Sequence, residues 1–348
     1  MEYYKEEEIK NIEKARDIFD ELPKFCSGFF RYIGETTSAR TRLGYARDLR
    51  VFFNFLKERN PDFKKKEIRD ITAEDMNRLT ADDLEEFLEY LSYYKQNDKE
   101  RINGEKGKSR KLSAVRRLLS YMYKKRLISG NPGELVDTPK IHLKSILTLE
   151  PDEVSRLLDI VKSGEGLSPK EKQFHNLIAA RDTAIITLLL GTGLRVSECV
   201  GIDITDIDFS TNGIMITRKG GNKVIIYFGE EVETALYAYL AEREEITPLP
   251  GSENALFLSI QKKRIGVRAV QKLVKKYSEM VTTLKKITPH KLRSTYGTAL
   301  YRETGDIYLV ADVLGHSDVN TTKKHYAKLS DENRRHAANA VKLGRDES

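Results

Sequence analysis

The segment "TPHKLRSTYGTAL" (residues 288–300) combines a histidine and an arginine at the beginning of a predicted helix. Thr288 is a suitable N-cap and Pro289 a suitable first helical residue, so His290 and Arg293 fall together on the first turn. Backbone N–H groups and the positive end of the helix dipole favour anions at this position. The segment therefore predicts a binding site for a phosphate-like anion.

A second arginine follows a glycine turn in "GTGLRVSE" (residues 191–198). Arg195 is expected to begin a helix, and Glu198 lies one turn further on, where its carboxylate can orient the guanidinium. An ordinary surface ion pair would give the same pattern, so this segment alone leaves both roles open. Near the end of the chain, "LGHSDVNTTKKHYAKLS" places Tyr326 ten positions after His316, among cationic side chains.

The elements that must position these residues change in character along the chain. Beyond a Gly- and Pro-containing interruption, with a linker placed at residues 139–146, one helix is expected to end at Gly191. The segment "IDFSTNGIMITRKGGNKVIIYF" then predicts β-strands joined by "NG" and "KGGN" turns, before helices resume. The first 130 residues are predicted to be helical, with a Thr80–Asp83 capping pair and apolar stripes of Tyr45, Leu49, Phe52, Phe53 and Leu56 and of Leu112, Val115, Leu119 and Met122.

Positive charge gathers in two blocks, although the net charge of the chain is only +7. Residues 101–126 contain ten lysines or arginines against one acidic residue, and residues 262–276 contain seven against none. Arg110, Arg117 and Lys124 recur along one face of a predicted helix. Two such blocks, one in each half of the chain, indicate a protein that grips phosphates from two sides. The simpler alternative is a pair of solvated helix faces.

Length and composition exclude several classes of protein. A chain of 348 residues exceeds a typical single domain, so two domains are expected. The apolar run "AIITLLL" is far shorter than the about 18 residues of a membrane span, so no membrane segment is expected. The acidic first residues do not resemble a signal peptide, and we expect a cytoplasmic protein. Cys26 and Cys199 lack metal-ligand spacing and are expected to be reduced core residues.

Taken in order, these motifs resemble those of the tyrosine recombinases, the family of phage integrases and of Xer and Cre recombinases. "GTGLRVSE", Lys219 in "RKGGNK", "HKLR", "LGHSDVNTT" and the tyrosine that follows match the family's Arg, Lys, His-x-x-Arg, His and Tyr. The helical part is similar to the family's core-binding domain over "TSARTRLGYARDLRVFFNFL" and "SRKLSAVRRLLSYMYKKRLISGNP". The likeness covers residues 36–330, and the first 35 residues match no part of the family pattern.

The resemblance implies a mainly α protein with a small antiparallel β-sheet, arranged as a two-domain, C-shaped DNA clamp. Its expected parts are an N-terminal helical extension (1–35), an all-α, SAM-like core-binding domain (36–138), the linker (139–146) and an α+β catalytic domain with a C-terminal tail helix (147–348). DNA contacts are expected from Arg40, Arg42, Lys108, Arg110, Lys111, Arg117, Lys124, Lys223 and Arg268.

The resemblance also implies phosphodiester cleavage by a protein nucleophile. Arg195 and Arg293 would neutralise the non-bridging oxygens through bidentate donors, with Glu198 orienting Arg195. His290 and His316 would exchange protons with the phosphate and the nucleophile.

Two further residues complete the implied reaction. Lys219 on the hairpin turn would protonate the departing 5′ oxygen, and Tyr326 would attack the phosphorus. A cationic pocket favours the phenolate, which accounts for the surroundings of Tyr326. No metal and no cofactor are expected, because two arginines supply positive charge and the phosphotyrosine conserves the bond energy.

The implied function is site-specific recombination through a covalent 3′-phosphotyrosine, for a mobile element or for resolving chromosome dimers. The expected partners are double-stranded DNA with paired recombination sites, three further protomers in a synaptic homotetramer formed from free monomers or weak dimers, and an accessory DNA-bending protein. A type IB topoisomerase would use the same chemistry without strand exchange. A catalytically silent DNA-binding protein and an unrelated basic scaffold are disfavoured by the complete catalytic set and by the order of the motifs.

Overall fold

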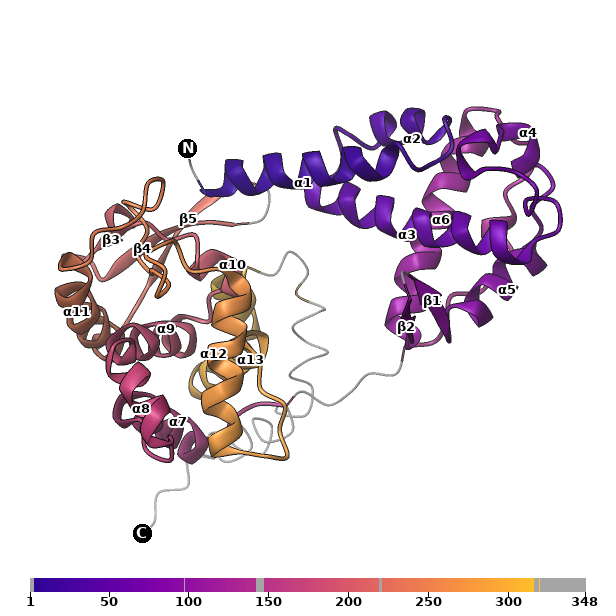
Figure 1. Ribbon diagram of the computed structural model, residues 1–348. Coiled ribbons are helices and arrows are strands. Elements are labelled where there is room, and N and C mark those ends of the chain that lie inside the picture. Colours follow the sequence, from indigo (N-terminus) through magenta and orange to yellow (C-terminus); the bar gives the residue numbers. More distant parts are fainter. Residues whose placement is uncertain (1–2, 97, 142–146, 219–220, 316–318, 320–348) are drawn as a thin grey trace, which may run out of the picture. The chain divides into compact units, whose positions relative to one another are not determined.

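The computed structural model describes residues 3–96, 98–141, 147–218, 221–315 and 319 (Figure 1). The chain divides into two compact units, Met1–Lys144 and Ser145–Ser348. This division falls inside the range 139–146 that the sequence predicts as a linker.

The first unit is built from helices around one apolar core. The long helix α3 (Ala39–Arg59) packs against α1 (Tyr3–Phe19) and α6 (Glu105–Lys124). Both predicted stripes are confirmed: Tyr45 packs against the core, and the other stripe residues of α3 and α6 are fully buried. The unit is completed by α2 (Cys26–Tyr32), α4 (Ala73–Met76), α5 (Ala81–Tyr90) and the 3-10 turns Ile68–Asp70 and Pro132–Glu134.

The beginning of α5 shows why local sequence predicts helix ends well. The Thr80 hydroxyl accepts from the Asp83 backbone N–H at 3.2 Å, and the Asp83 carboxylate accepts from the Thr80 N–H at 2.8 Å. The predicted capping pair is therefore confirmed as a reciprocal capping box, which satisfies backbone donors that the first helical turn leaves unpaired.

Two features of the first unit differ from the sequence prediction. Ile18 of α1 and Phe29 of α2 belong to the same core as α3, so the division predicted after residue 35 does not separate two bodies. The unit also contains an antiparallel hairpin of β1 (Tyr94–Gln96) and β2 (Lys99–Arg101), which an all-α interpretation misses. Strands of three residues are too short to give a recognisable two-residue period.

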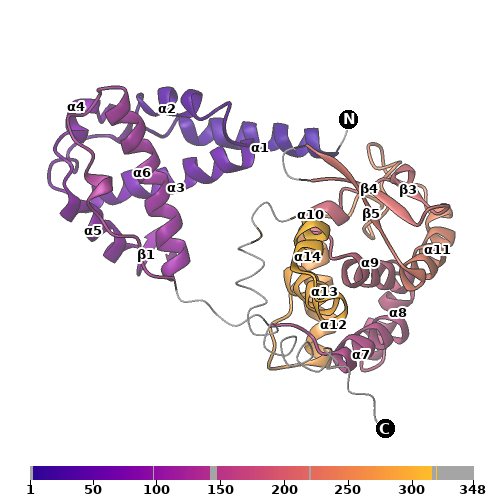
Figure 2. The same cartoon turned by 180° about the vertical axis from the view of Figure 1, so that it is seen from behind.

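The second unit combines helices with the predicted antiparallel sheet. The sheet has the order β3 (Ile207–Asp208), β4 (Gly213–Thr217), β5 (Lys223–Tyr227), preceded by the 3-10 turn Ile204–Asp206. Helix α9 (Ala179–Thr192) contacts α7 (Pro151–Ser163), α11 (Glu230–Glu244), α12 (Val267–Val281) and α13 (Pro289–Thr304). Helix α14 (Ile307–Leu314) lies against α13 (Figure 2). The α+β character of this unit confirms the prediction.

Helix α9 ends at Thr192, and its C-cap glycine lies two residues after Gly191, where the sequence predicts the end of the helix. The C-cap is Gly193, whose φ of +64° is the left-handed conformation that ends many helices. Gly191 lies inside the helix for a different reason, because a Cβ there would stand 2.5 Å from Cγ2 of Val232 on α11. One glycine allows close packing and the other turns the chain toward Arg195.

A buried polar network ties α9 to its neighbours. The Tyr277 hydroxyl of α12 lies 3.2 Å from Oδ2 of Asp182 on α9 and 3.1 Å from Nδ1 of His175 on α8 (Pro169–Asn176). Arg181 pairs with the other Asp182 oxygen at 2.6 Å. Burial raises the pKa of both Asp182 and Tyr277. The network fixes the helix that leads into the arginine cluster.

Both cysteines are buried and free, as the sequence predicts. Burial raises the pKa of the Cys26 thiol, and it raises that of Cys199 to about 12, so both thiols stay protonated at neutral pH. Within the described ranges, no helix is long and apolar enough to cross a membrane. The same residues contain no group of three or more His, Cys, Asp and Glu side chains placed to hold a metal ion.

Candidate active site

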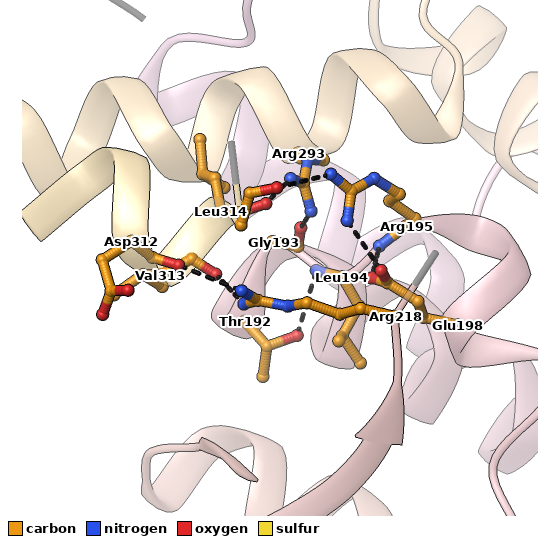
Figure 3. A network of polar contacts seen from close by, with 11 residues as sticks. Thr192, Gly193, Leu194, Arg195, Glu198, Arg218, Arg293, Asp312, Val313 and Leu314 are labelled. Atoms are coloured by element: carbon orange, nitrogen blue, oxygen red, sulfur yellow. Dashed lines mark hydrogen bonds and ion pairs between the residues drawn. The ribbon is translucent and has the colours of Figure 1, made fainter. Parts of the chain in front are cut away.

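Both predicted catalytic arginines, Arg195 and Arg293, contact the carboxyl end of α14 (Figure 3). Arg293 of α13 is buried, donates from Nη1 to the Gly193 carbonyl at 2.6 Å, and donates from Nη2 to the Leu314 carbonyl. Arg195 donates from Nη2 to the Gly315 carbonyl at 3.0 Å. Side chains far apart in sequence are thus held at one place by the last carbonyls of one helix.

Glu198 holds Arg195 in the way that the spacing predicts. Arg195 is the N-cap of α10 (Val196–Cys199), and its backbone N–H donates to Oε2 of Glu198 at 2.8 Å. Its Nη1 donates to Oε1 of the same carboxylate at 2.7 Å. Glu198 is only 3% exposed, so the ion pair is shielded from water on one side and is stronger than a surface pair. The surface-pair alternative does not fit this geometry.

The two predicted residues of the first turn of α13 differ in their surroundings. Thr288 is the N-cap by backbone position and Pro289 is the first helical residue, as predicted. His290 is exposed, whereas Arg293 is 5% exposed. The turn therefore presents an imidazole at the surface and a guanidinium inside the unit.

A third arginine belongs to the same cluster and is missing from the sequence prediction. Arg218, directly after β4, donates to the carbonyls of Asp312 at 3.3 Å and Val313 at 2.8 Å. Figure 3 shows its guanidinium beside the end of α14. Its position immediately before Lys219 in "RKGGNK" is the one sequence signal that could have pointed to it.

The remaining predicted catalytic residues, Lys219, His316 and Tyr326, lie outside the described residues, as does the predicted tail helix. Lys219 follows Arg218 in the chain, and His316 follows Gly315. Two of the three, Lys219 and His316, therefore directly follow described residues.

The predicted DNA-contacting face of α6 is present, and one of its members also has a structural contact. Arg117 and Lys124 are exposed. Arg110 is exposed too, but its guanidinium pairs with Asp48 of α3, a carboxylate that is 1% exposed. Burial raises the pKa of Asp48, and the charge of Arg110 opposes that rise. Arg110 therefore compensates a buried charge in addition to any contact with a ligand.

Lys111 is a correction to the predicted set of DNA contacts. It is 6% exposed and donates to Oδ1 of Asn103 at 2.9 Å, and burial lowers its pKa. Position 111 lies four residues before Val115 and thus on the core face of α6, which a count of charges along the sequence cannot distinguish from the outer face.

Other residues of the predicted DNA-contacting set differ in their exposure and in the hydrogen bonds that they make within the protein. Arg42 donates to the carbonyls of Gly34 at 2.8 Å and Thr37 at 2.5 Å, which closes the loop before α3. Lys108 donates to the Ser92 hydroxyl at 2.6 Å. Arg40, Lys223 and Arg268 are exposed, like Arg117 and Lys124.

Comparison with family models matches both units. The model described as "Phage integrase family" matches residues 148–333, and the model described as "Phage integrase, N-terminal SAM-like domain" matches residues 27–126. The first range contains every predicted catalytic residue.

Individual relatives cover nearly the whole chain. The tyrosine recombinase XerC of Caldanaerobacter subterraneus subsp. tengcongensis is 34% identical over 93% of this chain and 88% of the relative. The tyrosine recombinase XerS of Lactococcus lactis subsp. cremoris is 27% identical over 97% and 99%. Among solved structures, a Tn1549 transposon integrase in complex with transposon right end DNA has a TM-score of 0.63 at 19% identity, covering 90% of this chain and 99% of that one. The fold is therefore that of these recombinases.

The Glu198–Arg195 pair gives a first test of the site. In Glu198→Gln, an amide N–H₂ group faces either the Arg195 backbone N–H or its guanidinium, so one buried donor loses its acceptor. We expect the free energy of unfolding in urea to fall by about 1–3 kcal/mol. Glu279→Gln is the matched control, because its ion pair with Lys275 is mostly exposed, and it should change stability by less than about 0.5 kcal/mol. Equal stability of the two variants would contradict an orienting role for Glu198.

Proposed function

Because this chain belongs to the phage integrase family of tyrosine recombinases, we propose that the arginine cluster at the end of α14 is its phosphate-binding catalytic centre. The chain is a site-specific recombinase, an enzyme that breaks and rejoins DNA strands. The observation that carries the assignment is the convergence of Arg195 and Arg293 on neighbouring carbonyls. Two guanidinium groups held at one place can share one phosphate.

In this proposal, Arg195 and Arg293 neutralise the scissile phosphate. Each presents a planar fork of N–H donors that matches two phosphate oxygens, which a lysine ammonium cannot do. Their bonds to fixed backbone carbonyls, and that of Arg195 to Glu198, set the plane of each fork before the substrate arrives. Donors placed in advance stabilise the charge that develops in the transition state without reorganising.

The covalent step assigns roles to the residues outside the described ranges. The Tyr326 oxygen attacks the phosphorus, and the bond from phosphorus to the 5′ oxygen breaks as the new bond forms. The Lys219 ammonium gives a proton to the leaving 5′ oxygen, and the strand remains attached as a 3′-phosphotyrosine. His290 and His316 exchange protons with the nucleophile and the phosphate. Rejoining reverses the step with a 5′ hydroxyl as the attacking group.

The expected substrate is double-stranded DNA held by both units. Exposed Arg117 and Lys124 on α6 and Arg268 on α12 offer positive charge to phosphates from the two units. Strand exchange joins two duplexes, each cut on both strands, so we propose a homotetramer in the synaptic complex. A DNA substrate and bacterial relatives favour a role in the bacterial cytoplasm or nucleoid.

The nucleophile is tested with a suicide substrate, nicked so that the released strand diffuses away. The unaltered protein should form a covalent 3′-phosphotyrosyl adduct in the presence of EDTA. Tyr326→Phe should bind the same DNA with unchanged affinity and form no adduct, because only the attacking oxygen is removed. An adduct that persists in Tyr326→Phe, or one that strictly requires a divalent metal, would refute the assignment.

A second assay, with intact duplexes, separates recombination from the topoisomerase alternative. Two duplexes of different length that carry the same site should yield hybrid products if strands are exchanged. Relaxation of supercoiled DNA without hybrid products would instead favour nicking and resealing alone.

The outer face of α6 is tested through the salt dependence of DNA affinity. Changing Arg117 and Lys124 together to glutamine should weaken binding to all sequences. It should also flatten the slope of log affinity against log salt by up to about two units, roughly one for each DNA phosphate that the protein no longer neutralises.

Arg110 is left intact because its loss would also leave Asp48 buried without a partner. Lys10→Gln is a control, since Lys10 is an exposed lysine of the same unit that pairs with Glu6 and Glu7 of its own helix. An unchanged slope in the double variant would mean that this face is merely solvated.

A further inference from the structure

Arg218 connects the sheet of the second unit to the carboxyl end of α14. Its Nη1 donates to the Asp312 carbonyl at 3.3 Å and its Nη2 to the Val313 carbonyl at 2.8 Å. Arg293 and Arg195 bind the next two carbonyls, those of Leu314 and Gly315. Four consecutive carbonyls of the chain are therefore divided among three guanidinium groups, as Figure 3 shows for the labelled residues.

The end of α14 is built to receive this arginine. The last carbonyls of a helix have no partner inside the helix and carry the negative end of its dipole, so a cation is favoured there. The planar fork of Arg218 reaches two successive carbonyls at once, which a single ammonium group cannot do in the same geometry. Gly315 ends the helix with φ +59°, and a Cβ at this position would lie 2.4 Å from Nη1 of Arg218.

The backbone of Arg218 belongs to the turn between β4 and β5. Its N–H donates to the Asn222 carbonyl at 2.8 Å, and its own carbonyl accepts from the Gly221 N–H at 3.0 Å. Gly221 has a φ of +87°, which suits a tight turn. Arg218 thus closes the turn through its main chain and fixes it to α14 through its side chain. The next residue in the chain is Lys219.

We propose that Arg218 is a positioning residue, which aligns the β4–β5 turn and the proposed acid Lys219 with the phosphate held by Arg195 and Arg293. The inference rests on the proposed function, because it assigns Arg218 an effect on proton donation to the leaving oxygen. It differs from a phosphate contact, in which Arg218 would bind the substrate directly. It also differs from a purely structural role, in which its loss would impair all steps alike.

Two substrates that differ in one atom separate these roles. One has the ordinary 5′ bridging oxygen at the scissile phosphate, and the other has sulfur there, which leaves as a thiolate without needing a proton. Arg218→Ala should cleave the oxygen substrate about 100-fold more slowly, the order of loss expected when a reacting group is misplaced by about 1 Å. On the sulfur substrate we expect it to cleave within about threefold of the unaltered protein, since general-acid catalysis is no longer used. Arg218→Lys keeps the charge and one carbonyl contact. Its cleavage rate on the oxygen substrate should therefore lie between the rates of Arg218→Ala and of the unaltered protein.

Three comparison variants make the result specific. Lys219→Ala should show the same rescue by sulfur, whereas Arg195→Ala should stay slow on both substrates because it acts on the non-bridging oxygens. Arg302→Ala removes the same charge from an exposed side chain, paired with Glu150 at 3.5 Å, and should resemble the unaltered protein on both substrates. DNA affinity and the midpoint of urea unfolding are measured for every variant.

The possible outcomes distinguish a failure of the positioning role of Arg218 from a failure of the acid role proposed for Lys219. If Lys219→Ala is rescued by sulfur and both Arg218 variants are equally slow on both substrates, Arg218 does not position the acid, although the proposed function stands. If neither Lys219→Ala nor Arg218→Ala is rescued, Lys219 is not the general acid, and the positioning role of Arg218 fails together with the role proposed for Lys219, whereas the phosphate-binding role of Arg195 and Arg293 is unaffected. If Arg218→Ala does not fold, the intermediate rate and partial rescue expected of Arg218→Lys decide the question.

Discussion

The bonds between arginine side chains and the last carbonyls of α14 are the interaction on which the site depends. They bring together the loop between α9 and α10, the turn after β4 and the first turn of α13. Because all three bind one helix end, a displacement of any of them disturbs the carbonyls that the others use.

The arrangement also solves an electrostatic problem. Three guanidinium groups close together repel one another, and burial of Arg293 adds a desolvation cost. The negative end of the α14 dipole and the buried carboxylate of Glu198 offset this repulsion before any substrate is present. A bound phosphate would then add negative charge to a cluster that is already held in place, so little of the binding energy is needed to order it.

Much of this could be predicted from the sequence, and the rest depends on contacts between distant segments. The helix stripes, the Thr80–Asp83 box, the three strands and the Arg195–Glu198 pair are local patterns, and the structure confirms each of them. The observed end of α9 differs from the predicted one because two glycines lie close together and have different functions. Gly191 allows close packing against Val232 of another helix, and Gly193 is the C-cap. The burial of Lys111 and the pairing of Arg110 with Asp48 likewise depend on how α6 is rotated against α3. The contacts of Arg218 are with the end of a helix that begins about ninety residues later in the chain, so no local pattern predicts them.

The central claim is that the guanidinium groups of Arg195 and Arg293 act by neutralising the charge of one phosphate. Its most direct test is the cleavage rate of Arg195→Ala on a scissile phosphate in which one non-bridging oxygen is replaced by a methyl group, so that the group to be cleaved is neutral. On the natural phosphate we expect the variant to be about 100- to 1,000-fold slower than the unaltered protein. On the neutral methylphosphonate the account predicts that most of this difference disappears, because there is no negative charge left for Arg195 to neutralise. A deficit of the same size on both substrates would contradict it.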